Sequence, residues 1–245
     1  MADIHTEEIT YMGNGIEMKG YIAWDSNAEG PRPGVLVVHE WWGRNDYAQR
    51  RARMLAEAGY TGLALDLYGD GRIAADPDEA GELMNARIDD MEGTRARFTA
   101  ALDALIAHPN VDGNRTGAIG YCFGGGVVTH MARMGLPLDI TGSFHGAVGL
   151  AAVDGPDHID CRIMVYNGEA DVLIDEDQIA GFKAEMAKTD ANYDFIQLPG
   201  ALHGFSNPIA TSNGQKYGLP LAYNALADES SWAHLRLTME HVFAQ

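Results

Sequence analysis

The sequence is poor in cysteine and has no long apolar run. Only two of its 245 residues are cysteines, Cys122 and Cys161, too few for the disulfide framework of a secreted protein. No stretch approaches the ~18 consecutive apolar residues of a membrane-spanning helix. The start of the chain lacks the basic and apolar regions of a secretory signal. We therefore expect a cytoplasmic protein that does not bind membranes.

Basic residues are also scarce. The chain has 17 Lys and Arg against 35 Asp and Glu, which gives a formal net charge of −18 at pH 7. Nucleic acids and anionic membranes are bound through basic patches, so neither is an expected partner. We interpret the acidity as a solubility feature rather than as part of a site.

Signatures of metals and nucleotide cofactors are missing as well. Neither H-x-x-x-H nor C-x-x-C occurs, and the acidic residues show no ligand spacing. The glycine-rich stretch 117–126 does not spell G-x-G-x-x-G, and no P-loop lysine follows it. We expect no metal and no cofactor.

The length and pattern of the chain predict one α/β domain over residues 1–245. Two segments around Gly13-Asn14-Gly15 predict an N-terminal hairpin, and residues 204–228 predict a long loop. Alternating strands and helices favour a mostly parallel central sheet flanked by helices on both faces, with no large lid domain. The expected strands are 7–12, 16–24, 35–39, 60–68, 115–119, 139–145, 162–167 and 193–198, and the expected helices are 47–58, 78–86, 89–107, 127–134, 175–188 and 230–243.

The most informative motif is the run Gly120-Tyr121-Cys122-Phe123-Gly124-Gly125. It follows an apolar strand-like segment and opens a helix-like one, as in the G-x-S-x-G elbow that exposes a nucleophile on a sharp turn. Cysteine stands where serine is usual. The motif therefore predicts Cys122 as a thiol nucleophile.

Candidate partners of the thiol follow in the order typical of α/β-hydrolases, acid before histidine. Asp171 comes shortly after the strand predicted at 162–167, and His203 after the strand predicted at 193–198. Asp171 has rivals in Glu169, Asp175 and Asp177, of which Asp175 fits a helix N-cap better. His39 and His145 also end predicted strands and are further candidates to line the site.

Each residue type suits a definite role. His203 takes the thiol proton and later returns it to the leaving group, while Asp171 orients the imidazole. The backbone N–H of Phe123 and that of Trp41, in the loop after the strand at 35–39, are the candidate oxyanion-hole donors.

These residues resemble the dienelactone hydrolase family of α/β-hydrolases. The resemblance spans nearly the whole chain in the family's order. It implies a single-domain fold and a triad of Cys122, His203 and Asp171. It also implies a role for Glu40, which in the family contacts the resting thiol and is displaced by substrate so that the thiolate forms. The matching segments are 39–43 (HEWWG), 66–69 (DLYG), 120–125 (GYCFGG), 168–171 (GEAD) and 203–205 (HGF).

One position departs from the family pattern. Family members that open dienelactones carry an arginine soon after the catalytic histidine, and the matching position here is Asn207. Arg72 and Arg87 are candidates for a second anchor of the substrate carboxylate. Aromatic residues indicate an apolar pocket, and the expected substrate contacts are Trp42, Tyr68, Phe205 and Asn207, with Trp41, Phe144 and Tyr217 as further candidates.

The leading hypothesis is a hydrolase of small carboxylic esters or lactones that works through an acyl-thioester on Cys122. The alternative is a hydrolase-fold protein that binds or senses a small molecule with little turnover. A peptidase or acyl-transferase would need a helical lid, and the segment 146–159 is too short for one. The expected partner is a small-molecule substrate, and the expected state a monomer or small homo-oligomer.

Overall fold

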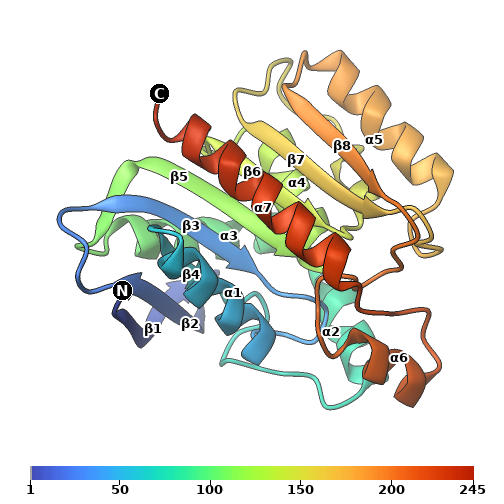
Figure 1. Cartoon of the computed structure of the whole chain (residues 1–245), viewed down its shortest axis with the longest axis horizontal. Helices are drawn as coiled ribbons and strands as arrows, with labels where there is room; N and C mark the ends of the chain where they lie inside the picture. The colour runs from blue at the N-terminus through green and yellow to red at the C-terminus, as the bar shows by residue number, and fades with distance from the viewer. Residues whose placement is uncertain (1) are drawn as a thin grey trace. The chain divides into compact units, whose positions relative to one another are not determined.

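The structure is a computed structural model that describes residues 2–245 (Figure 1). The described residues form eight strands and seven α-helices. The chain divides into two compact units, one up to Ala118 and one from Ile119 onward. Each unit has its own layered arrangement of strands and helices, and the single-domain organisation stays a prediction.

The first unit begins with the predicted hairpin. Strands β1 (Ile4–Gly13) and β2 (Ile16–Asp25) are antiparallel, with Gly13 opposite Ile16. Both turn residues have positive φ, 51° at Asn14 and 75° at Gly15, which is the backbone that an Asn-Gly hairpin turn requires. β2 pairs antiparallel with β4 (Thr61–Ala64), and β4 pairs parallel with β3 (Arg32–Val38).

Helices cover both faces of the sheet in this unit. A Cβ on Gly34 of β3 would lie against Leu105 of α3 (Met91–Ile106), and one on Gly62 of β4 against Ala52 of α1 (Asp46–Glu57). In the parallel register Gly62 lies opposite Val35, the neighbour of Gly34. Because successive residues of a strand point to opposite faces, α3 and α1 lie on opposite faces. Helix α2 (Pro77–Ile88) precedes α3 and contacts it.

Strand β4 is shorter than the predicted 60–68. The reason is Asp66, whose buried carboxylate accepts hydrogen bonds from the N–H groups of Tyr68 (2.9 Å), Gly69 (2.8 Å) and Gly71 (2.8 Å). These bonds turn the backbone out of the strand, in the way aspartate side chains stabilise turns. The chain after Leu65 is therefore a turn held by one carboxylate.

The second unit is built on parallel strands. Strand β5 (Val111–Tyr121) carries the chain into it, and β6 (Ile140–Phe144), β7 (Arg162–Gly168) and β8 (Tyr193–Leu198) pair parallel in that order. The helical elements between and after them are α4 (Phe123–Arg133), the short 3-10 turn η1 (Val148–Ala151), α5 (Glu176–Lys188), α6 (Ala210–Tyr217) and α7 (Ala225–Val242).

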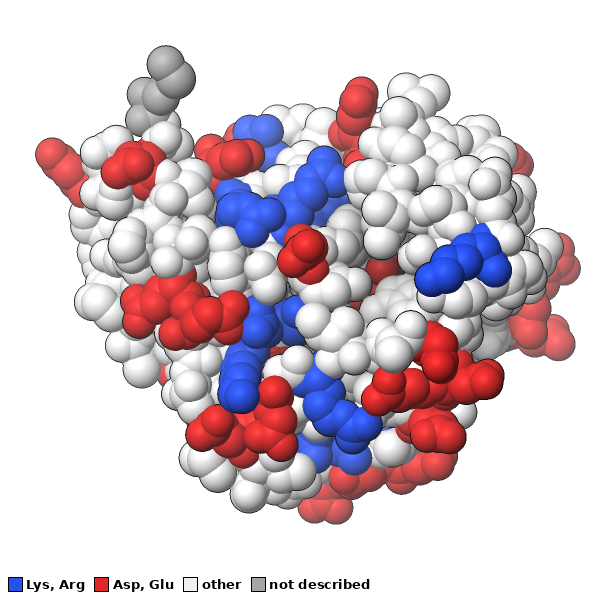
Figure 2. All heavy atoms as spheres, turned by 90° about the horizontal axis from the view of Figure 1, so that it is seen from below, with Lys and Arg blue, Asp and Glu red and all other residues white. Residues whose placement is uncertain are grey.

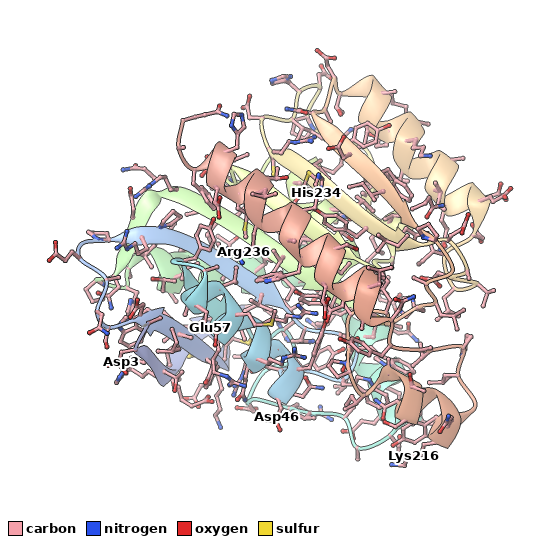
Figure 3. All side chains as sticks on the ribbon, in the orientation of Figure 1. Asp3, Asp46, Glu57, Lys216, His234 and Arg236 are labelled. Carbon is pink, nitrogen blue, oxygen red and sulfur yellow. The ribbon has the colours of Figure 1, made fainter. Side chains whose placement is uncertain are left out.

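Helices again flank both faces. A Cβ on Gly142 of β6 would lie against Leu235 of α7, whereas the next residue, Ser143, lies against Gly125 of α4. Consecutive strand residues face opposite ways, so α7 and α4 cover opposite faces, as Figure 1 shows. His234, labelled in Figure 3, lies on the strand-facing side of α7, with Nδ1 3.0 Å from the Tyr166 hydroxyl of β7.

The predicted loop over 204–228 was wrong. It contains α6, whose sequence has little helix propensity but ends on Gly218 in the left-handed conformation (φ 66°). Helix α7 also begins earlier than the predicted Ser230, because Asn224 is its N-cap and accepts the N–H of Ala227 at 3.1 Å. Ser230 lies inside the helix, where its hydroxyl donates to the Leu226 carbonyl.

Charged side chains of both signs share the surface. The face drawn in Figure 2 carries Lys and Arg between more numerous Asp and Glu side chains, consistent with the net charge of −18. Within residues 2–245, no helix is both long and apolar enough to span a membrane.

Gly120, on the strand side of the elbow, provides a first test of the fold. A Cβ there would overlap the backbone of Gly124 and lie 2.8 Å from the nitrogen of Gly125. We expect Gly120→Ala to lower the free energy of unfolding by about 3 kcal/mol or more. Urea unfolding measures this. The matched control is Gly81→Ala inside α2, where a Cβ meets nothing within 4 Å, and it should raise stability by about 0.5–1 kcal/mol. Equal effects would contradict the steric account.

Candidate active site

Cys122 lies at the turn between β5 and α4 with a backbone that side chains rarely adopt. Its φ is 54° and its ψ is −118°, a strained conformation for a residue with a Cβ. Hydrogen bonds hold it there. Its N–H donates to the Phe144 carbonyl (3.0 Å), and its own carbonyl accepts from Gly125 (3.0 Å), Gly126 (3.2 Å) and Ala147 (3.2 Å). The predicted elbow is thus present, with the thiol partly exposed.

The two cysteines of the chain have different surroundings. Cys122 is the N-cap residue of α4, and the N-terminal end of a helix stabilises negative charge. Cys161 is different, because burial raises the pKa of its thiol to about 12. A buried, protonated thiol is a weak nucleophile. Cys122 is therefore the reactive candidate of the two.

Asp171 and His203 meet after the ends of β7 and β8. Asp171 Oδ2 lies 2.8 Å from His203 Nδ1, and both side chains are almost fully buried. The two loops are joined by backbone hydrogen bonds, Glu169 N–H to the Leu198 carbonyl and Ala170 N–H to the Ala201 carbonyl, both 3.0 Å. Since a carboxylate oxygen can only accept a hydrogen bond, Nδ1 carries a proton. Nε2 is then the nitrogen that is available for proton transfer.

The electrostatics of His203 link it to Cys122. Burial alone would lower the pKa of His203. The negative charge of Cys122 and the hydrogen bond and charge of Asp171 outweigh burial and raise the pKa of His203 to about 10. The second unit thus favours the imidazolium form of His203.

The rival carboxylates have other partners. Asp175 is the N-cap of α5, where it accepts the N–H of Gln178 at 2.8 Å and completes a capping box. Glu169 accepts the N–H of Gly200 at 3.2 Å. Asp177 lies in the first turn of α5. Of the four acids considered, Asp171 is the one that contacts His203.

The substrate-binding candidates in the second unit are buried. Phe205 is fully buried, and its ring packs edge-on against His145, with centroids 5.1 Å apart. Asn207 uses its side-chain oxygen to accept the N–H of Ile209 at 3.1 Å, in the turn that leads into α6. Phe123 is the first residue of α4. Their contacts with substrate or oxyanion stay predictions.

The remaining predicted residues lie in the first unit. Glu40 is buried, and its carbonyl lies 2.6 Å from His39 Nδ1. The Tyr68 hydroxyl donates to the Trp41 carbonyl at 2.8 Å, and the rings of Trp41 and Trp42 are 5.0 Å apart. Glu40, Trp41 and Trp42 therefore lie in the loop after β3, and Tyr68 contacts this loop. Their roles stay predictions.

The two arginines considered as substrate anchors are already paired. Arg72 donates to Glu79 at 3.0 Å, and Arg87 lies 3.6 Å from the carboxylate of Asp90. Both pairs are within the first unit. Each arginine therefore has an acidic neighbour, but Arg87 Nη1 forms no hydrogen bond among the described residues.

Sequence reasoning considered His145 only as a lining residue and did not consider Ser206. The structure places His145 Nδ1 3.2 Å from the N–H of Cys122 and His145 Nε2 2.8 Å from the Ser206 hydroxyl. The available signals were a histidine at the end of a predicted strand and a serine three residues after His203. Neither pattern is specific enough to predict a contact across so many residues.

The model of the dienelactone hydrolase family matches residues 18–243. The chain belongs to the dienelactone hydrolase family. A crystal structure of a dienelactone hydrolase-like promiscuous phosphotriesterase from metagenomic libraries is 33% identical, with a TM-score of 0.90 over 99% of this chain and 100% of that one. Family membership and this match confirm the predicted α/β-hydrolase fold.

Curated relatives are more distant in sequence. A protein of Synechocystis sp. named "Putative carboxymethylenebutenolidase" is 27% identical, over 96% of this chain and 96% of its own length. Protein usf of Aquifex pyrophilus is also 27% identical, over 81% of this chain and 86% of its own. Membership of the dienelactone hydrolase family supports a hydrolase function with a small-molecule substrate.

Replacing Asp171 tests the histidine dyad. Asp171→Asn keeps the shape but removes the charge and allows the wrong imidazole tautomer, so we expect turnover to fall by about 10²–10⁴-fold. Steady-state ester hydrolysis measures this. Asp175→Asn is the matched control, since asparagine is an equally good N-cap, and it should leave turnover unchanged. Equal losses in both variants would argue against Asp171 as the orienting acid.

The raised pKa of His203 predicts a pH dependence of stability. The folded protein holds a proton on His203 that the unfolded chain releases above about pH 6.5. The stabilisation is therefore fully present below pH 6.5 and lost as the pH rises through about 10. We expect the difference in unfolding free energy between wild type and His203→Asn to shrink over this range. A difference that stays constant over this range would contradict the raised pKa of His203.

Proposed function

We propose that this protein hydrolyses small carboxylic esters or lactones through Cys122, His203 and Asp171. The observation that carries the proposal is the 2.8 Å contact between His203 and Asp171 next to a cysteine held in a strained elbow. Nucleophile, base and orienting acid follow in the chain order of α/β-hydrolases. Cys122 comes directly after β5, and Asp171 and His203 come within five residues of the ends of β7 and β8, at the strand ends where α/β sheets place their ligands.

Acylation begins with the Cys122 thiolate and the His203 imidazolium. The sulfur attacks the carbonyl carbon, and the carbonyl oxygen takes the negative charge of the tetrahedral intermediate. When the carbon–oxygen bond of the ester breaks, His203 Nε2–H gives its proton to the leaving alkoxide. The products of this half-reaction are an alcohol and an acyl-thioester on Cys122. With a lactone, the alcohol stays tethered to the acyl group.

Deacylation reverses the roles. Neutral His203 takes a proton from water, and the hydroxide attacks the thioester carbon. Collapse of the second tetrahedral intermediate expels the Cys122 thiolate and releases the carboxylic acid. His203 is left as the imidazolium beside the thiolate, which is the pair with which acylation began. Asp171 stays ionised throughout and stabilises the charged ring.

Two supporting roles belong to the proposal. The N–H groups of Phe123 and Trp41 are the proposed donors to the oxyanion, which is usually the largest single stabilisation in acyl transfer. Glu40 is proposed to hold the thiol in its resting form until substrate displaces the carboxylate. A nearby carboxylate disfavours a thiolate, so a group that leaves on substrate binding suits this task.

The substrate is proposed to be neutral. Asn207 stands where dienelactone-opening members carry an arginine, and both Arg72 and Arg87 are paired with acids. With a net charge of −18, the protein is poorly suited to collect anionic substrates. Uncharged short-chain esters and lactones fit these features better than a dienelactone that carries its carboxylate.

A substrate panel tests the proposal. It contains p-nitrophenyl acetate, butyrate and octanoate, a neutral lactone, a carboxylate-bearing dienelactone and a phosphotriester, the last because one similar protein is named a promiscuous phosphotriesterase. We expect the neutral carboxylic esters or the lactone to turn over fastest and Cys122→Ala to lose at least about 10³-fold in kcat.

Each contrary result has a definite meaning. Full activity in Cys122→Ala would rule out the thiol mechanism. A stoichiometric burst without steady turnover would favour the alternative, a binding or sensing protein. Preference for the charged dienelactone would show that another group replaces the missing arginine.

The role of Glu40 has its own test. Glu40→Gln removes the charge while keeping the shape. Because the carboxylate disfavours a thiolate, we expect iodoacetamide to alkylate Cys122 of the substrate-free variant about 10-fold faster than that of wild type at neutral pH. Glu29→Gln, at an exposed loop acid, is the matched control and should behave as wild type. Unchanged alkylation kinetics in Glu40→Gln would assign Glu40 to the structure of its loop only.

A further inference from the structure

His145 lies directly behind the nucleophile, and its side chain is fully buried. It follows β6, with a φ of 41° that non-glycine residues rarely adopt. Its own N–H donates to the Tyr166 carbonyl at 2.8 Å, which anchors the strained residue to β7. A buried polar ring in a strained backbone, next to a second strained residue, indicates more than core packing.

The hydrogen bonds of the ring define its tautomer. The N–H of Cys122 is shared between the Phe144 carbonyl at 3.0 Å and His145 Nδ1 at 3.2 Å. Since an N–H group can only donate, Nδ1 is the acceptor nitrogen. The proton is then on Nε2, which donates to the Ser206 hydroxyl at 2.8 Å. The imidazole is thus a neutral bridge with one end on the nucleophile's backbone and the other on Ser206.

Ser206 belongs to the same tight loop as His203. It comes three residues after the histidine, and the loop is closed by the bond from Asn207 N–H to the Gly204 carbonyl at 2.9 Å. Ser206 is fully buried. The ring of His145 also packs edge-on against the ring of His203, with centroids 5.1 Å apart and planes at 64°. His145 therefore touches the thiol's backbone, the base's loop and the base's ring.

We propose that His145 and Ser206 are a positioning pair, which fixes the elbow of Cys122 relative to the loop of His203 and so sets the path for proton transfer between Sγ and Nε2. The inference rests on the proposed function. Neither residue is assigned a bond-making or proton-transfer step. Their effect is geometric, and displacements of about 1 Å in such a path cost up to about 10²-fold in rate.

Four variants separate the two ends of the bridge. His145→Asn keeps a hydrogen-bond acceptor near the Nδ1 position and loses the donor to Ser206. His145→Gln keeps a donor near the Nε2 position and loses the acceptor for Cys122. Ser206→Ala removes the acceptor of the bridge, and Ser206→Thr restores a hydroxyl. The matched control is Ser231→Ala, another buried serine, whose hydroxyl donates to the Ala227 and Asp228 carbonyls inside α7.

Each variant is characterised in three experiments. Steady-state kinetics gives kcat and KM for the best ester of the panel. Alkylation by iodoacetamide gives the pH profile of Cys122, and thermal unfolding gives the melting temperature. We expect His145→Asn, His145→Gln and Ser206→Ala to lower kcat by about 10–100-fold with KM within about 3-fold. Their alkylation midpoints should move to higher pH, because a misplaced His203 stabilises the thiolate less. Ser206→Thr should recover most of kcat and the wild-type midpoint.

The control decides between positioning and mere stability. Ser231→Ala should lower the melting temperature about as much as Ser206→Ala but leave kcat and the alkylation profile unchanged. If Ser206→Ala and His145→Gln match Ser231→Ala in kcat and alkylation midpoint, the positioning role is overturned. If either His145 variant fails to fold, Ser206→Ala, which removes a single oxygen, still decides the outcome.

Failure of the proposed function has a different signature. In that case Cys122→Ala keeps its turnover, and alkylation of wild type does not inactivate it. Failure of the positioning role alone leaves turnover dependent on Cys122 and abolished by alkylation, with the His145 and Ser206 variants unaffected.

Discussion

The candidate site depends on one constraint, the positive φ of Cys122. A residue with a side chain does not hold φ 54° unless its surroundings impose it. Here the Phe144 carbonyl takes the Cys122 N–H, and Gly125, Gly126 and Ala147 donate to the Cys122 carbonyl. These bonds need close approach of two backbones, which is why glycines line both sides of the turn. Hydrogen bonds with β6 and α4 offset the free-energy cost of the strained backbone. The thiol therefore lies at the N-terminus of a helix and not in the core.

The same arrangement separates the tasks of the ionisable groups. Asp171 fixes which nitrogen of His203 carries the permanent proton, and the thiolate raises the proton affinity of the other. Burial works against the imidazolium, so the pair exists only because both negative partners act on one ring. Cys161 is buried, and burial makes its thiol hold its proton more tightly, whereas Cys122 is partly exposed. The difference between the two thiols is therefore one of surroundings and not of residue type.

Much of this could be predicted from the sequence, for identifiable reasons. Three features can be recognised without knowledge of the fold. They are the elbow, the chain order of Cys122, Asp171 and His203, and the N-cap at Asp175. The misses arose where tertiary partners decide. Asp66 ends β4 by taking three backbone N–H groups, α6 forms despite poor helix propensity, and Asn224 caps α7 ahead of Ser230. The bridge through His145 joins residues 122, 145 and 206, a contact that no spacing rule encodes. The role of Glu40 was predicted from family resemblance alone, and that of Trp41 from its place in the loop after a predicted strand.

Helix α7 has a consequence for the order in which the molecule can be made. Its Leu235 fills the space beside Gly142, on the face of β6 opposite α4. A ribosome completes every residue of the candidate triad, the last being His203, well before it reaches residue 235. Until then β6 has one apolar face with nothing to cover it. The nascent chain therefore carries the full set of candidate reactive side chains before translation has delivered the helix that covers this face of β6.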